Sequence, residues 1–294
     1  MKEKKIVTVD HIQKAVAAVK AERPAYEELL GFYEKIFLAQ EKAKEQTQLK
    51  SIQIPDELLS IKREEGFPLI DRADFAVDVK ASETLLRELC RVAVETNEVL
   101  AEAGTKLVDA LDQEALQVST LFSKILSEDS QGFQKVAQEL GVDEKILAFF
   151  SYNSLRPSLS LCAEQLAGYF DEDKLWKKGY CPVCGSPPAL SILRDEGNRF
   201  LVCSFCGHEW HTQRIYCPFC NNQDHTKLHY FFGEEEKHYR VNVCDVCKKY
   251  LKTVDARELK HPIYFLLEQV STLHLDLLAR EQGLESGSPL WLQI

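Results

Sequence analysis

The sequence predicts a multidomain α and β protein, with an N-terminal all-α domain, two small β-rich modules that each hold four cysteines, and a C-terminal helix. Three observations predict this arrangement. Residues 1–175 show helical apolar spacing and no Cys-x-x-Cys pair. Four such pairs then follow between Cys181 and Cys247, surrounded by short β-rich stretches. Helical spacing returns near the end of the sequence.

Composition restricts the class of protein. The chain has 294 residues, enough for more than one domain, with 45% apolar and 28% charged residues, as in an ordinary folded protein. No apolar run approaches the roughly eighteen residues of a membrane helix. The N-terminus starts basic, but charged residues recur where a signal peptide needs an apolar region. We therefore expect a cytoplasmic protein without a membrane span.

Charge is unevenly distributed. Residues 176–260 contain 13 Lys and Arg against 10 Asp and Glu, about +3, whereas the whole chain carries −10. The rest of the chain therefore carries −13. The cysteine-rich part is mildly basic and the remainder is acidic.

Helix signals recur through residues 1–175, the predicted helical domain. An apolar stripe in 24–40 follows Pro24, which suits a first helical turn. Ser82 and Asp143 are candidate N-caps of further helices. The segment 156–170 gives one more helix with an apolar face. Residues 52–79 have a weaker pattern and predict a long connection that contains a short helix.

The cysteine-rich part predicts two small modules, residues 176–212 and 213–260. Short β-rich stretches lie beside the cysteine pairs, and turn-forming residues separate them. These stretches are 189–193, 199–203, 228–232 and 239–244. The last part, 261–294, is predicted to hold a helix over 263–281 that packs back on the helical domain.

The turn residues around the pairs fit metal-binding loops. Pro182 and Pro218 follow the first cysteine of their pairs and fix φ there. Three pairs are followed by a residue that tolerates a left-handed backbone: Gly185, Gly207 and Asn221. Lys248, after the fourth pair, does not fit this pattern.

Spacing predicts how the pairs combine. Eighteen residues separate Cys184 from Cys203 and 23 separate Cys220 from Cys244, enough for a hairpin each, whereas only ten separate Cys206 from Cys217. Sequential pairing therefore predicts two tetrahedral metal sites. The first holds Cys181, Cys184, Cys203 and Cys206, and the second holds Cys217, Cys220, Cys244 and Cys247. A cross-braced arrangement, first pair with third, stays open.

Other interpretations of the cysteines compete with this one. A structural disulfide framework does not suit a reducing compartment, and thioredoxin-like catalysis uses a pair at the start of a helix in a βαβ unit. A purely structural metal is a serious alternative, because a module of about forty residues cannot bury a sufficient apolar core and needs a metal ion to stabilise it. Four thiolates accept iron or zinc equally.

The remaining candidates are weaker. Cys90 and Cys162 lie in helical patterns, where cysteine is usually a buried apolar residue. His208 and His211 could replace a cysteine ligand, but two complete sets already exist. No Gly-rich phosphate loop or nucleophile elbow is present in the sequence, so we expect a protein that is not an enzyme.

The cysteine-rich part resembles a known family. The segments "GYCPVCGSPPALSIL", "RFLVCSFCGHEWHTQRIYCPFC", "VCDVCKKYLKTVD" and "LDLLAREQG" are similar to FdhE, the accessory protein needed to produce active respiratory formate dehydrogenases. The resemblance implies two rubredoxin-like modules, with iron in the sites of the eight paired cysteines. It also implies a cytoplasmic protein that binds the catalytic subunit of formate dehydrogenase before export.

The leading interpretation is a chaperone-like maturation factor whose metal could make client binding redox-sensitive. The acidic helical half could meet basic client residues, including a twin-arginine export signal. A zinc-ribbon protein that binds nucleic acid is one alternative, supported by the slight basic excess and by aromatic residues near the pairs. A rubredoxin-like electron-transfer protein is another.

Overall fold

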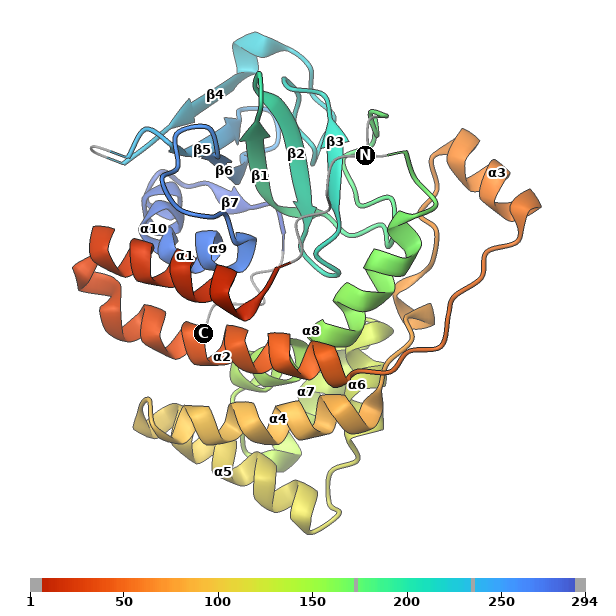
Figure 1. Cartoon of the computed structure of the whole chain (residues 1–294), viewed down its shortest axis with the longest axis vertical. Coiled ribbons are helices and arrows are strands. Elements are labelled where there is room, and N and C mark those ends of the chain that lie inside the picture. The colour runs from red at the N-terminus through yellow and green to blue at the C-terminus, as the bar shows by residue number, and fades with distance from the viewer. Residues whose placement is uncertain (1–6, 172–173, 234–235, 289–294) are drawn as a thin grey trace. The chain divides into compact units, whose positions relative to one another are not determined.

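The computed structural model describes residues 7–171, 174–233 and 236–288. The chain forms two compact units (Figure 1). Of the described residues, those up to Lys50 and Arg72–Ser158 make up a helical unit, and Ser51–Asp71 together with those from Leu159 onward make up a sheet unit. The helical first half, the sheet and the C-terminal helical region that the sequence predicts are confirmed. The exact domain boundaries stay a prediction.

The helical unit packs amphipathic helices around an aromatic core. Phe32 and Phe149 stack with their ring centroids 6.1 Å apart, and Tyr33 meets Phe149 edge-on at 6.2 Å. These side chains are buried, so they anchor α2 and α8 of this unit together. The helices are α1 (Val9–Glu22), α2 (Glu27–Gln46), α4 (Val79–Val94), α5 (Glu98–Asp112), α6 (Val118–Leu126), α7 (Ser130–Leu140) and the first part of α8 (Glu144–Ala167).

One predicted N-cap is confirmed and the other is wrong. The Asp143 carboxylate accepts hydrogen bonds from the backbone N–H groups of Lys145 and Ile146 at the start of α8. Ser82 does not cap a helix but is buried inside α4, which begins one turn earlier. Asp78 caps this helix, accepting from the Ala81 N–H at 3.0 Å. An ionised carboxylate is a strong cap, because it also complements the positive helix end.

The predicted helices on either side of residue 156 form one continuous helix, α8, with Pro157 inside it. Proline lacks an N–H group, so the carbonyl of Asn153, four residues earlier, loses its helical partner. The buried Gln40 side chain supplies the replacement, donating from Nε2 to the Asn153 carbonyl at 2.9 Å. The helix therefore continues through the proline because a neighbouring helix satisfies the freed group.

This repair gives a testable expectation. Replacing Gln40 with Leu keeps the volume but leaves the Asn153 carbonyl buried without its donor, so the free energy of unfolding should fall by about 1–3 kcal/mol. Chemical denaturation followed by circular dichroism measures the change. Gln113, at the C-terminal end of α5 and exposed, is the matched control, and its replacement by Leu should change stability by less than about 0.5 kcal/mol.

The predicted connection over 52–79 contains α3 (Asp56–Glu65), as expected for its short helix. Gly66 ends α3 with a left-handed backbone, φ 76°, which closes the helix through its N–H to the Lys62 carbonyl. Residues 51–71 belong to the sheet unit, although they precede most of the helical unit in the sequence.

The sheet unit is built on one mixed sheet that contains the strands of both cysteine-rich segments. The strand order is β3-β2-β1-β6-β5-β4, and β7 pairs with β6 off this path. The pairing of β1 with β6 is parallel and joins the two antiparallel halves. The strands are β1 (Pro188–Arg194), β2 (Asn198–Cys203), β3 (Glu209–Thr212), β4 (Leu228–Phe231), β5 (Tyr239–Cys244), β6 (Lys249–Asp255) and β7 (Glu285–Ser286).

One face of the sheet forms an apolar core with the C-terminal helices (Figure 1). The core includes alternate residues of the strands, such as Ile192, Val241 and Val254, together with Leu275 and Ala279 of α10 (Leu273–Glu281). The predicted helix over 263–281 is divided into α9 (Phe265–Ser271) and α10. The packing of this region on the helical domain, as expected from the sequence, stays a prediction.

Buried polar pairs tie these helices to the sheet. The Lys252 ammonium on β6 lies 2.7 Å from the Asp276 carboxylate on α10, and both side chains are buried. Tyr250 donates to the same carboxylate at 2.8 Å. A second buried group joins Tyr239, which donates to Glu268 at 2.6 Å, and His261, whose Nε2 lies 3.2 Å from that carboxylate. Within the described residues, no helix combines the length and apolarity that a membrane crossing requires.

Candidate metal centres

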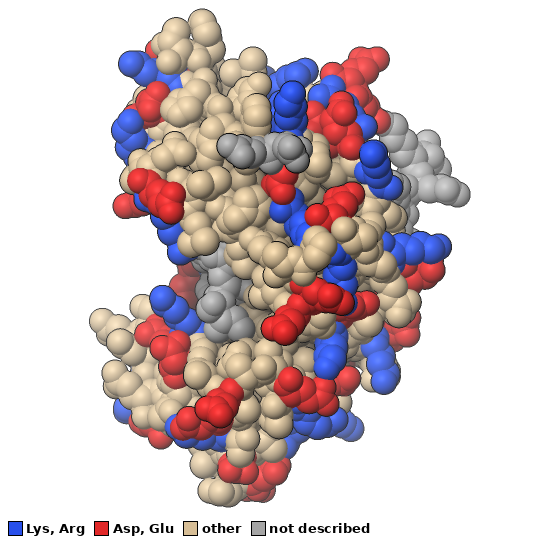
Figure 2. Space-filling view, turned by 90° about the vertical axis from the view of Figure 1, so that its left-hand side faces the viewer, with Lys and Arg blue, Asp and Glu red and all other residues tan. Residues whose placement is uncertain are grey.

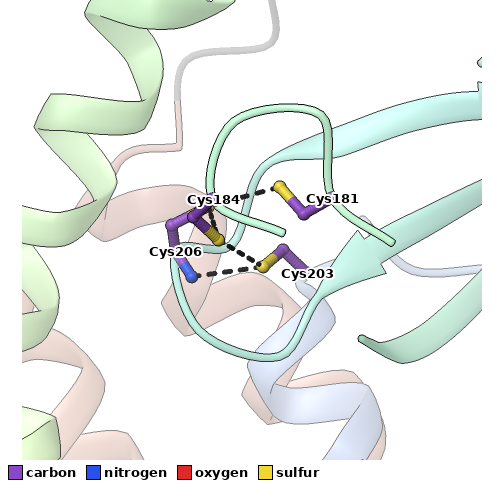
Figure 3. A group of neighbouring side chains, drawn as sticks. All are labelled: Cys181, Cys184, Cys203 and Cys206. Atoms are coloured by element: carbon purple, nitrogen blue, oxygen red, sulfur yellow. Dashed lines mark hydrogen bonds between the residues drawn. The ribbon is translucent and has the colours of Figure 1, made fainter. Parts of the chain in front are cut away.

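The first candidate centre brings Cys181, Cys184, Cys203 and Cys206 together (Figure 3). Cys181 and Cys184 lie in the loop before β1, whereas Cys203 ends β2 and Cys206 lies in the turn after it. The Cys184 Sγ atom is 3.5 Å from Cys203 Sγ and 3.6 Å from Cys206 Sγ. Four sulfurs around one tetrahedral ion at bonds of about 2.3 Å would stand about 3.8 Å apart. The donor set therefore fits a metal ion.

The second candidate centre brings Cys217, Cys220, Cys244 and Cys247 together with similar spacing. Cys217 Sγ lies 3.7 Å from Cys247 Sγ, and Cys220 Sγ lies 3.6 Å from Cys244 Sγ. Cys217 and Cys220 come from the loop after β3, whereas Cys244 ends β5 and Cys247 lies in the turn before β6. The structure thus has the sequential grouping and not the cross-braced one.

The local backbone explains why these sequences form sulfur-binding turns. The residue after the second cysteine returns its N–H to the carbonyl of the first, as from Gly185 to Cys181 at 2.8 Å and from Asn221 to Cys217 at 2.9 Å. Gly185, Gly207 and Asn221 have left-handed backbones, as predicted. Lys248 adopts the same conformation, φ 58°, and closes its turn onto Cys244 at 2.8 Å. Lys248, which did not fit the residue preference of the other three pairs, therefore has the same backbone conformation as they do.

Backbone amides also point at one sulfur of the first centre, that of Cys203. The N–H groups of Phe205 and Cys206 lie 3.3 and 3.4 Å from Cys203 Sγ. Such donors stabilise a thiolate. The first centre is thus organised to hold negative sulfur.

A segment that the sequence pattern did not connect with the cysteines braces the first centre. Leu69 donates its N–H to the Pro182 carbonyl at 2.9 Å, and Ile70 donates to the Val183 carbonyl at 3.0 Å. The Tyr180 hydroxyl also donates to the Gly66 carbonyl at 2.8 Å. These hydrogen bonds join positions more than a hundred residues apart, and no local sequence motif predicts them.

Burial in the first centre opposes ionisation of two of its thiols when no cation is bound. Burial raises the pKa of Cys181 and Cys206, and hydrogen bonding with neighbouring cysteines contributes. Burial also opposes ionisation of Cys184, but hydrogen bonds from the three other cysteines and Ser186 outweigh it and lower the pKa of this thiol. A bound divalent or trivalent cation would stabilise all four thiolates.

The two centres differ in exposure. All four cysteines of the first are buried, whereas in the second Cys220 is exposed and Cys247 is half-buried. A chelator must approach the ion and displace its sulfurs one by one, so exposed ligands favour attack. We expect metal release in two phases, with the second centre emptied at least about tenfold faster, a difference of about 1.4 kcal/mol in barrier.

A chelator that changes its absorption when it binds the released metal measures the rates of these two phases. A Cys220→Ser variant should lack the fast phase and keep the slow one. A single phase in the wild-type protein that accounts for both ions would contradict the difference in exposure.

A close backbone contact joins the loops of the two centres. A Cβ atom added at Gly179 would lie 1.8 Å from the Pro218 carbonyl oxygen, far inside van der Waals contact. Because the Pro218 oxygen belongs to the backbone and cannot rotate away, Gly179→Ala should lower the apparent melting temperature by several degrees and weaken metal retention at the second centre. Thermal denaturation and elemental analysis measure both effects. At Gly31 in α2 a Cβ would meet nothing nearer than 3.8 Å, so Gly31→Ala should leave stability equal or higher.

The weaker sequence candidates lie outside both centres. Cys90 and Cys162 are buried in α4 and α8, and burial raises the pKa of Cys90 to about 12. The His211 ring stacks on Phe200 with centroids 4.9 Å apart, and the His208 ring lies 6.0 Å from that of Phe170. Neither histidine belongs to the sulfur clusters among the described residues.

Fold and sites together define a class: a helical domain joined to a sheet that carries two rubredoxin-like, zinc-ribbon-like four-cysteine centres. Residues 180–214 match the family model "FdhE, central domain". The chain is 35% identical over 151 residues to a "Protein FdhE homolog" of Aquifex aeolicus, and 33% identical over 116 residues to "Protein FdhE" of Escherichia coli. The resemblance to the FdhE family is confirmed.

The extent of these matches differs. The Aquifex alignment covers 49% of this chain and 51% of the relative, and the Escherichia alignment covers 38% and 37%. The chain thus spans about half the length, or less, of the curated relatives it matches. The crystal structure of the FdhE protein from Pseudomonas aeruginosa superposes with a TM-score of 0.71 at 22% identity, covering 97% of this chain and 96% of that one, so the fold is shared throughout.

Proposed function

We propose that this protein is an accessory factor for the assembly of formate dehydrogenase, which binds the catalytic subunit of that enzyme in the cytoplasm. The observation that carries the proposal is the pair of four-cysteine centres within a fold shared with FdhE over nearly the whole chain. The FdhE relatives support the accessory role, and the catalytic subunit is the client that the sequence resemblance implies.

A role without catalysis at the metal is consistent with the ligands. A catalytic metal site keeps a coordination position open for water or substrate, whereas four protein thiolates fill a tetrahedral ion. Each centre offers four sulfurs that lie close to one another. These eight cysteines would therefore hold two metal ions, iron or zinc, that shape the sheet unit rather than bind substrate.

Redox-sensitive client binding is the finer part of the proposal. If iron fills the second centre, its exposed Cys220 and half-buried Cys247 leave it open to an electron donor or to the client. Reduction of a rubredoxin-type iron adds one negative charge to that surface. Client affinity would then change with the oxidation state of this centre, and a zinc-loaded protein would show no such change.

Electron transfer is a second candidate function that the same exposure favours. It requires that reduced protein pass electrons to an acceptor repeatedly, without forming a stable complex. Stopped-flow reoxidation by the purified client distinguishes this function from assembly. Multiple turnovers without stable binding would support electron transfer, and stable binding without turnover would support the accessory role.

Nucleic-acid binding has less support. Phe205 and Tyr216, two aromatic residues near the cysteine pairs, are buried and cannot stack on bases. On the face shown in Figure 2, acidic and basic side chains are interspersed, without the continuous basic surface that a phosphate backbone requires.

Capture of the client tests the proposal. The tagged protein is incubated with the catalytic subunit, purified without its partner subunits, under anaerobic conditions with and without dithionite. We expect a stable complex with the wild-type protein and loss of most binding in Cys220→Ser. Gln113, exposed at the C-terminal end of α5, supplies the control Gln113→Ala, which should bind normally. Absence of binding by wild-type protein in both oxidation states would contradict the proposal.

A further inference from the structure

A cavity of about 310 Å³ opens beside the second four-cysteine centre, within the sheet unit. Its strand residues alternate with those of the apolar core: Asn242 with Val241 on β5, and Thr253 with Val254 on β6. Side chains alternate between the two faces of a strand. The cavity therefore lies on the sheet face opposite the one covered by α10.

The cavity is lined by basic side chains. The other titratable lining residues are two cysteines of the second centre and two tyrosines. The basic lining residues are Arg199, Arg214, Arg240, Lys249, His225 and His229. No Asp or Glu lines the cavity among the described residues. In a chain with a net charge of −10, such a surface is unusual. Its potential attracts anions.

The environment of Arg199 gives the strongest evidence for an anion in the cavity. Its side chain is 3% exposed, yet no carboxylate of the described part of the chain lies within ion-pair distance of it. Nε donates to the Ser191 hydroxyl at 3.0 Å, and Nη1 donates to the Tyr216 carbonyl at 3.0 Å. These neutral partners fix the guanidinium without balancing its charge. A buried charge that no carboxylate balances is costly, so an anion in the cavity would relieve it.

The Thr253 hydroxyl gives independent evidence for a ligand in the cavity. It is 2% exposed and lines the cavity, and its Oγ1 has no hydrogen-bond partner among the described residues. Thr253 is the register partner of Ser191 on β1 and of Arg240 on β5. A buried hydroxyl without a partner costs about 1–3 kcal/mol. The hydroxyl thus stands between two strands that present groups able to bind the same ligand.

Aromatic rings hold the cations in place around the cavity. The Arg240 guanidinium carbon lies 5.1 Å from the centroid of the Tyr230 ring, and the Lys249 ammonium lies 5.9 Å from that of Phe219. Arg240 also meets Asp255 at 3.2 Å, but Asp255 is shared with Arg257 at 2.7 Å. One carboxylate thus serves two guanidinium groups, so Arg240 keeps positive charge for a further anion.

We propose that this cavity is a binding site for an oxyanion, a carboxylate or a phosphate, carried on a flat apolar group. Arg199, Arg240 and Thr253 would bind the oxyanion, and Tyr230 and Phe219 would contact the apolar group. The volume exceeds that of a bare carboxylate or phosphate and matches the lower range of small-ligand cavities. The inference does not depend on the identity of the client.

A competing explanation is that the cations only balance the thiolates of the second centre, because Cys217 and Cys244 line the same cavity. Under that explanation the loss of a cation would release the metal, and no anion would bind. Thr253 distinguishes the two explanations, because its hydroxyl carries no charge to balance thiolates but would donate to an oxyanion.

The test uses the full-length metal-loaded protein and phenyl phosphate as the probe, with titration calorimetry and backbone amide NMR. We expect saturable binding that weakens with salt, and binding of phenol, which lacks the oxyanion, at least about tenfold weaker. Arg240→Gln and Thr253→Val should each weaken phenyl phosphate about tenfold or more, because each removes a donor to a charged group. The matched control is Arg280→Gln, which removes an exposed cation of α10, on the opposite side of the sheet, and should leave the affinity unchanged.

The source of the oxyanion is resolved in a second arm with the acetylated peptide Glu-Tyr-Glu. Tighter binding of the peptide would assign a carboxylate from a protein segment, and tighter binding of phenyl phosphate would assign a phosphorylated small molecule. No saturable binding of either probe overturns the proposal. Binding of phenyl phosphate that Thr253→Val leaves unchanged also overturns the proposal. If Arg240→Gln in addition loses the second metal ion, the explanation that the cations balance the thiolates is supported instead.

Discussion

Cys181→Ser is expected to remove the metal of the first centre and to disrupt the sheet unit beyond it. Cys181 is fully buried, and its centre connects the loop before β1 with the end of β2, two central strands. Structural four-ligand metal sites contribute about 10–16 kcal/mol of folding free energy, as much as the whole stability of an ordinary domain. Because β1 pairs with β6, the loss should spread to the second centre. Elemental analysis should find less than one metal ion per chain, and limited proteolysis should cleave within 176–260.

The outcome at the second centre supplies the comparison. Cys220→Ser changes an exposed ligand in a loop, so we expect it to lose one ion, keep the first centre and resist proteolysis over β1 and β2. Cys162→Ala, a buried cysteine outside both clusters, should retain both ions. Full metal content and normal protease resistance in Cys181→Ser would contradict the structural role of the first centre.

Asp276→Ala is expected to have the largest effect of any change outside the centres. It leaves the Lys252 ammonium buried without its carboxylate partner, which lies 2.7 Å away. It also removes the acceptor of the Tyr250 hydroxyl. Breaking a buried pair from one side costs about 3–5 kcal/mol, so the unfolding midpoint of the sheet unit should fall sharply. Chemical denaturation followed by tryptophan fluorescence measures this change.

Two controls separate charge burial from general damage. Replacing both partners, Lys252→Met with Asp276→Leu, should recover most of the lost stability because no charge remains buried. Glu102→Ala breaks the exposed pair with Lys106 and should change stability by less than about 1 kcal/mol. A double variant as unstable as Asp276→Ala would show that the loss comes from packing instead.

Local signals in the sequence predicted the cysteine centres well. Each Cys-x-x-Cys pair carries its own turn chemistry, and the hairpin-sized separations limit which pairs can meet. The first helices and the Asp143 cap were predictable for the same reason, since their determinants lie within a few residues. Lys248 shows the limit of residue preference, because closure of the turn onto Cys244 fixes its backbone at φ 58°.

Features that depend on distant partners were not predictable. The continuation of α8 through Pro157 depends on Gln40, more than a hundred residues away. The parallel pairing of β1 with β6 merges two segments that each look like an independent module. The bracing of the first centre by Leu69 and Ile70 likewise has no local signature. The residues that line the cationic cavity come from five strands, so no single stretch of sequence shows it.

The measurement that tests the central claim most directly is metal content with a visible absorption spectrum, after anaerobic purification, with and without dithionite. Two four-thiolate centres predict two metal ions per chain. With iron, thiolate-to-iron bands should be present and bleach on reduction, as the FdhE resemblance implies. Two zinc ions in a colourless protein would keep the centres as structural and remove the redox-sensitive binding. A well-folded protein without bound metal, and with all eight paired cysteines freely reactive, would contradict the account.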